Sequence, residues 1–157
     1  MPMSDLCSAS PVSISRTASL RQAALLMRNS HVGSIVVLDA DGGSRRPVGM
    51  LTDRDIVLKG VVEDRDPGKT RVEDIMSTEL VFVSRNVGLY EAVRKMRQNN
   101  VRRLIVTDEA GGLCGLFSTD DLVRLIGEEI GEVGELFARQ SRTEIPAPAG
   151  ASVRKTA

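Results

Sequence analysis

The sequence is poor in aromatic residues and has no excess of charge of either sign. Aromatic residues make up 3% of the 157 positions and Trp is absent, which is too little for a platform that stacks unpaired bases. Lys plus Arg and Asp plus Glu each number 21, so the formal net charge is zero. Such a chain has no general field to attract a phosphate backbone or an anionic lipid surface. We therefore do not expect nucleic acid as the main partner.

Sulfur, imidazole and long apolar runs are also scarce. With two cysteines, Cys7 and Cys114, and the single His31, the chain cannot supply a disulfide framework or a recognisable zinc site. Its longest apolar stretches, such as residues 35–38, are strand-sized and far short of the roughly 20 residues that cross a bilayer. Residues 1–10 lack the basic start and apolar run of a signal peptide. We therefore expect a cytoplasmic protein that is not associated with a membrane.

An internal repeat is the strongest positive feature of the sequence. Residues 12–39 align with residues 81–108 at a spacing of 69, with identical residues at many positions. Beyond the loop that follows, the spacing falls to 66, because the first copy has a longer turn over residues 39–47. The polar residues 63–73 separate the copies and are typical of a linker.

Hydrophobic periodicity predicts the same elements, β-α-β-β-α, in both copies. Leu20, Ala23 and Met27 have the i, i+3, i+7 spacing of one helix face, and the short apolar runs are typical of strands. A unit of roughly 55 to 60 residues would be marginal alone, so the copies should share a core, sheet against sheet. The prediction is an α/β protein of the α+β type, with pseudo-twofold symmetry and two related clefts between the copies, where small ligands usually bind.

A short motif closes each copy where its second helix begins. A Gly and two apolar residues are followed by a hydroxyl residue and, three residues later, by Asp: Thr52 and Asp55, then Ser118 and Asp121. A hydroxyl followed at this spacing by a carboxylate is a helix capping box. The start of a helix also presents free N–H groups that suit an anion, so capping is compatible with binding of a ribose diol or a phosphate. Both interpretations stay open.

The repeated unit, the paired motifs and the segments 74–77 and 101–106 together resemble a tandem cystathionine β-synthase (CBS) domain pair, over about residues 5–130. The resemblance is to a stand-alone module of the bacterial type. It implies regulation through an adenosine nucleotide, AMP, ADP, ATP or a related compound, bound in the clefts and signalled to a partner protein. It assigns ligand contacts to six side chains: Asp55 and Asp121 for ribose, Thr52 and Ser118 for ribose or phosphate, and Ser8 and Ser77 as candidates in the loop that frames adenine.

The copies differ where a phosphate would lie. Arg102 and Arg103 of the second copy align with Gly33 and Ser34 of the first. In nucleotide-binding members of the family, basic residues at this place face the phosphates, so one cleft should be the better anion site. Arg54, inside the first motif, is a further candidate. In the alternative interpretation, the two adjacent arginines form a solvated edge or pair with the acidic residues after their strand, and Arg54 lies on an exposed helical turn.

The apolar pattern continues beyond the second copy to about Gln140, without a counterpart in the first copy. Glycines 127, 131 and 134 each cost roughly 1 kcal/mol of helix stability relative to Ala, which indicates either a break or a tight helix contact. We expect this extension to contribute to a homodimer interface, through one apolar face: Leu122, Ile126, Val133, Leu136 and Phe137. Residues 142–157, rich in Pro, Ala and charge, are expected to be disordered.

These patterns divide the chain into repeat 5–62, linker 63–73, repeat 74–130, helical extension 131–141 and tail 142–157. Two functions remain open. One is a sensor of an adenosine nucleotide, and the other is an interaction module or scaffold of the same fold that binds no nucleotide. We do not expect an enzyme, because the sequence shows no Ser/His/Asp or Cys/His set, no metal-ligand spacing and no Walker-type loop.

Overall fold

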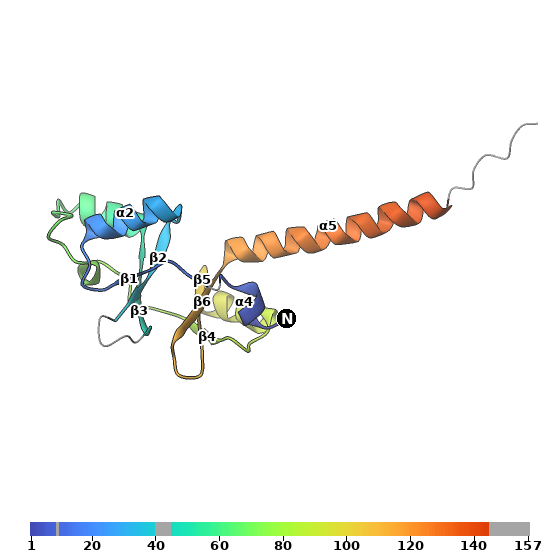
Figure 1. The fold of residues 1–157 in the computed structure, drawn as a ribbon, viewed down its shortest axis with the longest axis horizontal. Coiled ribbons are helices and arrows are strands. Elements are labelled where there is room, and N and C mark those ends of the chain that lie inside the picture. Colours follow the sequence, from blue (N-terminus) through green and yellow to red (C-terminus); the bar gives the residue numbers. More distant parts are fainter. Residues whose placement is uncertain (9, 40–44, 145–157) are drawn as a thin grey trace, which may run out of the picture. The chain divides into compact units, whose positions relative to one another are not determined.

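The computed structural model describes residues 1–8, 10–39 and 45–144. The chain divides into two compact units, Met1–Asp121 and a second that begins at Leu122. The first unit contains two three-stranded sheets with the same strand order and directions (Figure 1). A short helix, α1 (Met3–Leu6), precedes the first sheet. The mixed α/β class predicted from the repeat is confirmed.

The first repeat is built on the sheet β1-β2-β3, in which β1 is parallel to β2 and β2 is antiparallel to β3. Helix α2 connects the two parallel strands and packs Leu20, Ala23 and Met27 against the sheet, as their spacing predicts. The elements in chain order are β1 (Ser13–Ser15), α2 (Leu20–Ser30), β2 (Ser34–Leu38), β3 (Pro47–Thr52), α3 (Asp53–Asp55) and η1 (Ile56–Val61).

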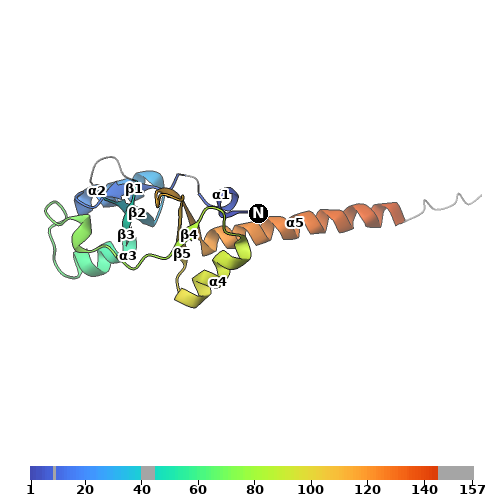
Figure 2. The same ribbon diagram turned by 90° about the horizontal axis from the view of Figure 1, so that it is seen from below.

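The second repeat has the same pairing in the sheet β4-β5-β6, and Figure 2 shows α4 beside β4 and β5. Helices α2 and α4 both end at a residue with left-handed backbone, His31 at φ 53° and Asn100 at φ 52°. These residues align at the spacing of 69, so the repeat extends to details of backbone conformation. The elements are β4 (Phe82–Ser84), α4 (Leu89–Asn99), β5 (Arg103–Thr107), β6 (Leu113–Ser118) and α5 (Thr119–Glu144).

The two sheets of the first unit share a core. A cluster of buried residues joins Val36 of β2 to Ile105 of β5 and Leu113 of β6, with Met50 and Leu80 packed against it. A second cluster fills the first repeat between α2 and its sheet, and it also takes in Val72 and Ile75 from the segment between the repeats. The predicted packing of sheet against sheet is therefore confirmed.

A lead-in segment precedes the first strand of each repeat and binds to the other repeat. We define these lead-in segments as residues 3–8 and 72–77. The first donates backbone hydrogen bonds to the turn 85–87 of the second repeat, and the second donates equivalent bonds to the turn 16–18 of the first repeat. The second lead-in includes the one-turn helix η2 (Val72–Asp74). Each repeat is thus completed by backbone from the other.

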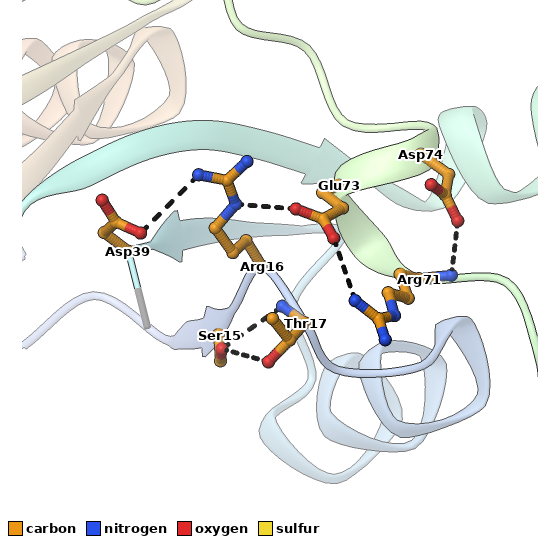
Figure 3. A network of polar contacts seen from close by, with 7 residues as sticks. All are labelled: Ser15, Arg16, Thr17, Asp39, Arg71, Glu73 and Asp74. Carbon is orange, nitrogen blue, oxygen red and sulfur yellow. Dashed lines mark hydrogen bonds and ion pairs between the residues drawn. The ribbon is translucent and has the colours of Figure 1, made fainter. Parts of the chain in front are cut away.

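Charged side chains reinforce one of these junctions (Figure 3). Arg16 donates from Nε to Glu73 Oε2 at 2.7 Å, and its Nη1 lies 3.6 Å from Asp39 Oδ1. Arg71 Nη1 lies 3.4 Å from Glu73 Oε1. At the other junction, the residue aligned with Glu73 is Ser4, which has no charge. The two junctions share a backbone pattern and differ in side chains.

Two expectations about helices need correction. The second helix of the first repeat is not an ordinary α-helix, because one turn of α3 is followed by the wider π-type turn of η1. The break considered at the three glycines of the C-terminal extension is wrong, because α5 continues through all of them to Glu144. The proposed boundaries of linker, extension and tail stay predictions, and residues 145–157 of the tail lie outside the described residues.

Candidate ligand-binding site

Both predicted motifs form capping boxes at the end of the third strand of each sheet. Thr52 donates to Asp55 Oδ2 from Oγ1 at 2.7 Å and from its backbone N–H at 3.1 Å, and Asp55 N–H donates back to Thr52 Oγ1 at 3.1 Å. Ser118 donates to Asp121 Oδ2 from Oγ at 2.6 Å and from N–H at 2.9 Å. The capping interpretation is therefore confirmed, and a binding role for these residues stays a prediction.

Each motif-bearing strand pairs with the lead-in segment of the other repeat. Met50 of β3 and Ser77 exchange two backbone hydrogen bonds of 2.9 Å. Leu116 of β6 and Ser8 exchange two of 3.1 and 3.3 Å. This pairing places each predicted lead-in serine beside the strand that ends in a capping box.

Two glycines make this close pairing possible. A Cβ atom on Gly49 would overlap the Met76 sulfur, and a Cβ atom on Gly115 would overlap the Cys7 sulfur and lie 2.9 Å from the Ser8 carbonyl oxygen. A sulfur side chain therefore lies over glycine at both junctions. Burial raises the pKa of the Cys7 thiol, which stays protonated at neutral pH.

A cavity of about 310 Å³ lies between the two repeats within the first unit. Its volume is at the lower end of the range for small-molecule sites. Three stretches form its walls: the end of β3 with its cap, residues 77–81, and the turn from α4 into β5. The lining residues are Met50, Thr52, Asp55, Ser77, Glu79, Leu80, Val81, Asn100, Val101, Arg102, Arg103 and Ile105.

The cavity brings together five of the nine side chains singled out in the sequence: Thr52, Asp55, Ser77, Arg102 and Arg103. The capping hydroxyl and carboxylate come from the first repeat, and the two guanidinium groups come from the second. Only the folded pair of repeats therefore assembles this combination. The carboxylate of Asp108, considered as an alternative partner for the arginines, accepts hydrogen bonds from the backbone of its own turn at 2.8 and 2.9 Å.

The other four predicted residues do not line this cavity. Ser8, Ser118 and Asp121 lie together at the second capping box, which is the equivalent place under the pseudo-twofold repeat. Arg54 is exposed on the short turn α3. The exposed-turn interpretation of Arg54 thus fits its position.

Asp55 is held in its ionised form although its side chain is only 20% exposed. Burial opposes the charge, but hydrogen bonds from Thr52 and the ammonium group of Lys59 outweigh burial and lower the pKa of Asp55. Lys59 Nζ lies 3.1 Å from Asp55 Oδ1. The cavity therefore presents a carboxylate that accepts hydrogen bonds at neutral pH.

The sequence patterns did not predict three residues at the site: Lys59, Glu79 and Asn100. Lys59 follows Asp55 at i+4, a spacing that brings opposite charges together on a helix and could have been recognised. Glu79 and Asn100 lie in different segments that meet only at the cavity. No local pattern marks them.

The described part of the chain shows neither a membrane-spanning helix nor a group of metal ligands. No helix there has both the length and the apolar composition to span a membrane. Over the same residues, no three His, Cys, Asp or Glu side chains are grouped so that they could hold a metal ion.

Comparison with known families identifies one match that covers both repeats. A family model described as "CBS domain" matches residues 3–65 and 72–128. The CBS domain-containing protein YhcV of Bacillus subtilis is 39% identical over 109 residues, which are 69% of this chain and 74% of that protein. Hypoxic response protein 1 of Mycobacterium tuberculosis is 30% identical over 124 residues, 79% of this chain and 84% of that protein.

A solved structure agrees with the sequence comparison. A CBS domain protein from Pyrobaculum aerophilum, complexed with AMP, is similar with a TM-score of 0.69 and 30% sequence identity. The similarity covers 78% of this chain and 90% of that one. The likeness therefore extends over the paired repeats and not over one repeat alone.

Proposed function

This chain belongs to the CBS domain family, and on that premise we propose that it is a cytoplasmic regulatory module that binds an adenosine nucleotide between its repeats. The ligand is AMP, ADP, ATP or a related compound, and the bound state is passed on to a partner protein. One observation carries the proposal: a single cavity combines the Thr52 and Asp55 cap with Arg102 and Arg103. The AMP complex of the Pyrobaculum protein supports the choice of ligand class.

The capping carboxylate suits a ribose diol. Asp55 is ionised, and a carboxylate has about four lone-pair directions for hydrogen bonds. Thr52 takes two of them at Oδ2 and Lys59 one at Oδ1. One direction at Oδ1 is not used by these contacts and can accept a ribose hydroxyl, and Ser77 adds a hydroxyl group on a second wall of the cavity.

The wall formed by the turn into β5 suits a phosphate. Arg102 and Arg103 supply planar groups with several N–H donors, which bind phosphate oxygens in charge-assisted hydrogen bonds. The residues aligned with them in the first repeat are Gly33 and Ser34, which have no charge and which the pseudo-twofold repeat relates to the second cleft. The cleft near Ser118 is therefore proposed to discriminate less between a nucleotide and its nucleoside.

Calorimetric titration with AMP and adenosine tests the assignment. Replacing both arginines, Arg102→Gln with Arg103→Gln, should weaken AMP binding roughly 10- to 100-fold and leave adenosine within about twofold, because only the charge-assisted contacts are lost. The matched control, Arg94→Gln with Arg97→Gln, removes the same charge from the exposed face of α4 and should change neither affinity.

Thermal unfolding separates the sensor from a module that binds no nucleotide. A ligand at 100 times its dissociation constant adds about 2.7 kcal/mol to the free energy of unfolding. If adenosine, AMP, ADP and ATP all leave the melting temperature unchanged, the nucleotide proposal is wrong and the interaction module remains.

We further propose that α5 joins two copies of the chain. Val123, Ile126, Ile130 and Val133 follow one another at intervals of three and four residues, the spacing of a coiled-coil seam, and are 47–70% exposed. Ile130→Glu should convert a dimer to a monomer in light scattering, whereas Glu132→Gln on the charged face should not. A wild-type chain that is monomeric with and without residues 131–157 would contradict the proposal.

A further inference from the structure

Lys59 connects two walls of the cavity without lining the cavity itself. Its ammonium group lies 3.1 Å from Asp55 Oδ1 and donates to the backbone carbonyl oxygen of Ile75 at 2.9 Å. One contact is with the cap of β3, and the other is with the lead-in segment of the second repeat. A single side chain therefore spans the junction between the repeats directly behind the candidate site.

Ile75, the residue that Lys59 contacts in the lead-in segment, is buried in the core of the first repeat. Ile75 is 2% exposed and belongs to the core cluster of the first repeat. Two residues later, Ser77 pairs with Met50 through both of its backbone groups and lines the cavity. Lys59 thus contacts the lead-in segment two residues before the residue that lines the cavity.

The link is specific to the first repeat. The residue aligned with Lys59 at the spacing of 66 is Leu125, which has no charge and no hydrogen-bond donor on its side chain. The wider π-type turn of η1 also begins directly after Asp55 and contains Lys59. Such turns are rare and occur frequently at functional sites.

We propose that Lys59 is a positioning residue of this cavity, which holds the Asp55 carboxylate and the Ser77 wall at a fixed separation for an adenosine ligand. The choice of ligand rests on the proposed function, and the positioning role rests on the two contacts of Lys59. The inference extends the proposed function, because the affinity of one cleft then depends on a residue that does not contact the ligand. The second cleft is independent of Lys59.

The charges around Asp55 give the proposal a pH signature. Lys59 contacts the carboxylate directly, and Glu79, Arg102 and Arg103 face the same cavity. Burial raises the pKa of Asp55, but the Thr52 hydrogen bonds and Lys59 outweigh burial and lower it. Without the ammonium group one of these lowering causes is lost, so the pKa of Asp55 should rise. Binding that needs the ionised carboxylate would then be lost at a higher pH.

The experiment compares Lys59→Met, Lys59→Arg and a charge-matched control, Lys69→Met, whose side chain is 88% exposed. Three quantities are measured: the AMP dissociation constant between pH 4 and 8, the titration of the Asp55 carboxyl by NMR, and hydrogen exchange of the Ser77 amide. Lys59→Met should weaken AMP roughly 10-fold at neutral pH, raise the pKa of Asp55 and accelerate Ser77 exchange several-fold. Lys59→Arg should restore most of the AMP affinity, the lowered pKa of Asp55 and the slow exchange of the Ser77 amide. Lys69→Met should change none of these three quantities.

An unchanged Asp55 titration together with unchanged Ser77 exchange in Lys59→Met would overturn the proposal, whatever happens to AMP affinity. If the wild-type chain binds no adenosine compound, the proposed function fails on its own. The carboxyl titration and the Ser77 exchange still decide the role of Lys59 in that case. If Lys59→Met does not fold, Lys59→Gln, which also removes the charge but keeps a polar side chain, provides the same readouts.

Discussion

Strands β3 and β6 end in the same capping box, but three positively charged residues at the first box and its cavity align with uncharged residues of the other repeat. Lys59 contacts the Asp55 carboxylate, and Arg102 and Arg103 line the same cavity. The residues aligned with these three are Leu125, Gly33 and Ser34. Backbone pairing leaves little freedom at the shared positions, whereas side chains that face a cleft can differ without disturbing the fold. The charge difference therefore supports the proposal that the two predicted clefts have unequal ligand preferences.

The largest expected effect comes from removing each carboxylate in turn. Asp55→Ala and Asp121→Ala should each cost about 1.5–3 kcal/mol of binding free energy in the cleft concerned, because charge-assisted hydrogen bonds to ribose are lost. In calorimetry, Asp55→Ala should remove the preference for AMP over adenosine, and Asp121→Ala should preserve it. Unchanged titration heats for both variants would contradict the assignment of either carboxylate to ribose.

The next largest effect tests the two glycine contacts. Gly115→Ala should lower the free energy of unfolding by about 2 kcal/mol and Gly49→Ala by about 1 kcal/mol, because overpacking forces the neighbours to move. A backbone carbonyl opposes both glycines, at 2.9 Å for Gly115 and 3.1 Å for Gly49, but the side chain that must move is the short Cys7 at Gly115 and the flexible Met76 at Gly49. Denaturant unfolding measures the difference, with Gly127→Ala inside α5, which meets nothing within 4 Å and should not destabilise, as the control. Equal losses at the two sites would show that side-chain flexibility does not decide the cost.

A smaller effect is expected from exchanging the residues that distinguish the two junctions. Glu73→Ser should destabilise the chain by about 0.5–1 kcal/mol, because the partly exposed Arg16 loses its carboxylate. Ser4→Glu places a carboxylate near Arg85 at the other junction and should stabilise by up to about 0.5 kcal/mol. Both effects should shrink in high salt. Stability that does not respond to salt in either variant would argue against an ion-pair origin.

The smallest expected effect concerns the starts of α2 and α4. Ser19 and Gln22 form a capping box on α2, whereas Gly88 occupies the cap of α4, three residues before Glu91. Gly88→Ser would complete the same box and should add a few tenths of a kcal/mol to the free energy of unfolding. Glu91→Ala in the Gly88→Ser background should remove most of this gain. If the gain in stability survives Glu91→Ala, it comes from the serine alone and not from the completed capping box.

Features that depend on neighbours close in the sequence were predictable. The spacing of Leu20, Ala23 and Met27 located α2, and a hydroxyl three residues before Asp located both capping boxes. The missed features involve distant segments or unusual local geometry. Asn100 reaches the cavity from the end of α4, and the π-type turn of η1 is not marked by any residue pattern.

By itself, the order of residues determined the duplicated β-α-β-β-α unit, the helix faces and the caps, because hydrophobic periodicity and short-range hydrogen bonds act over a few positions. Only the tertiary structure decided that each lead-in segment pairs with the opposite repeat and that Asp55 and Arg102 line one cavity. Those contacts join residues far apart in the chain. They form only when the two sheets bury their apolar faces against each other.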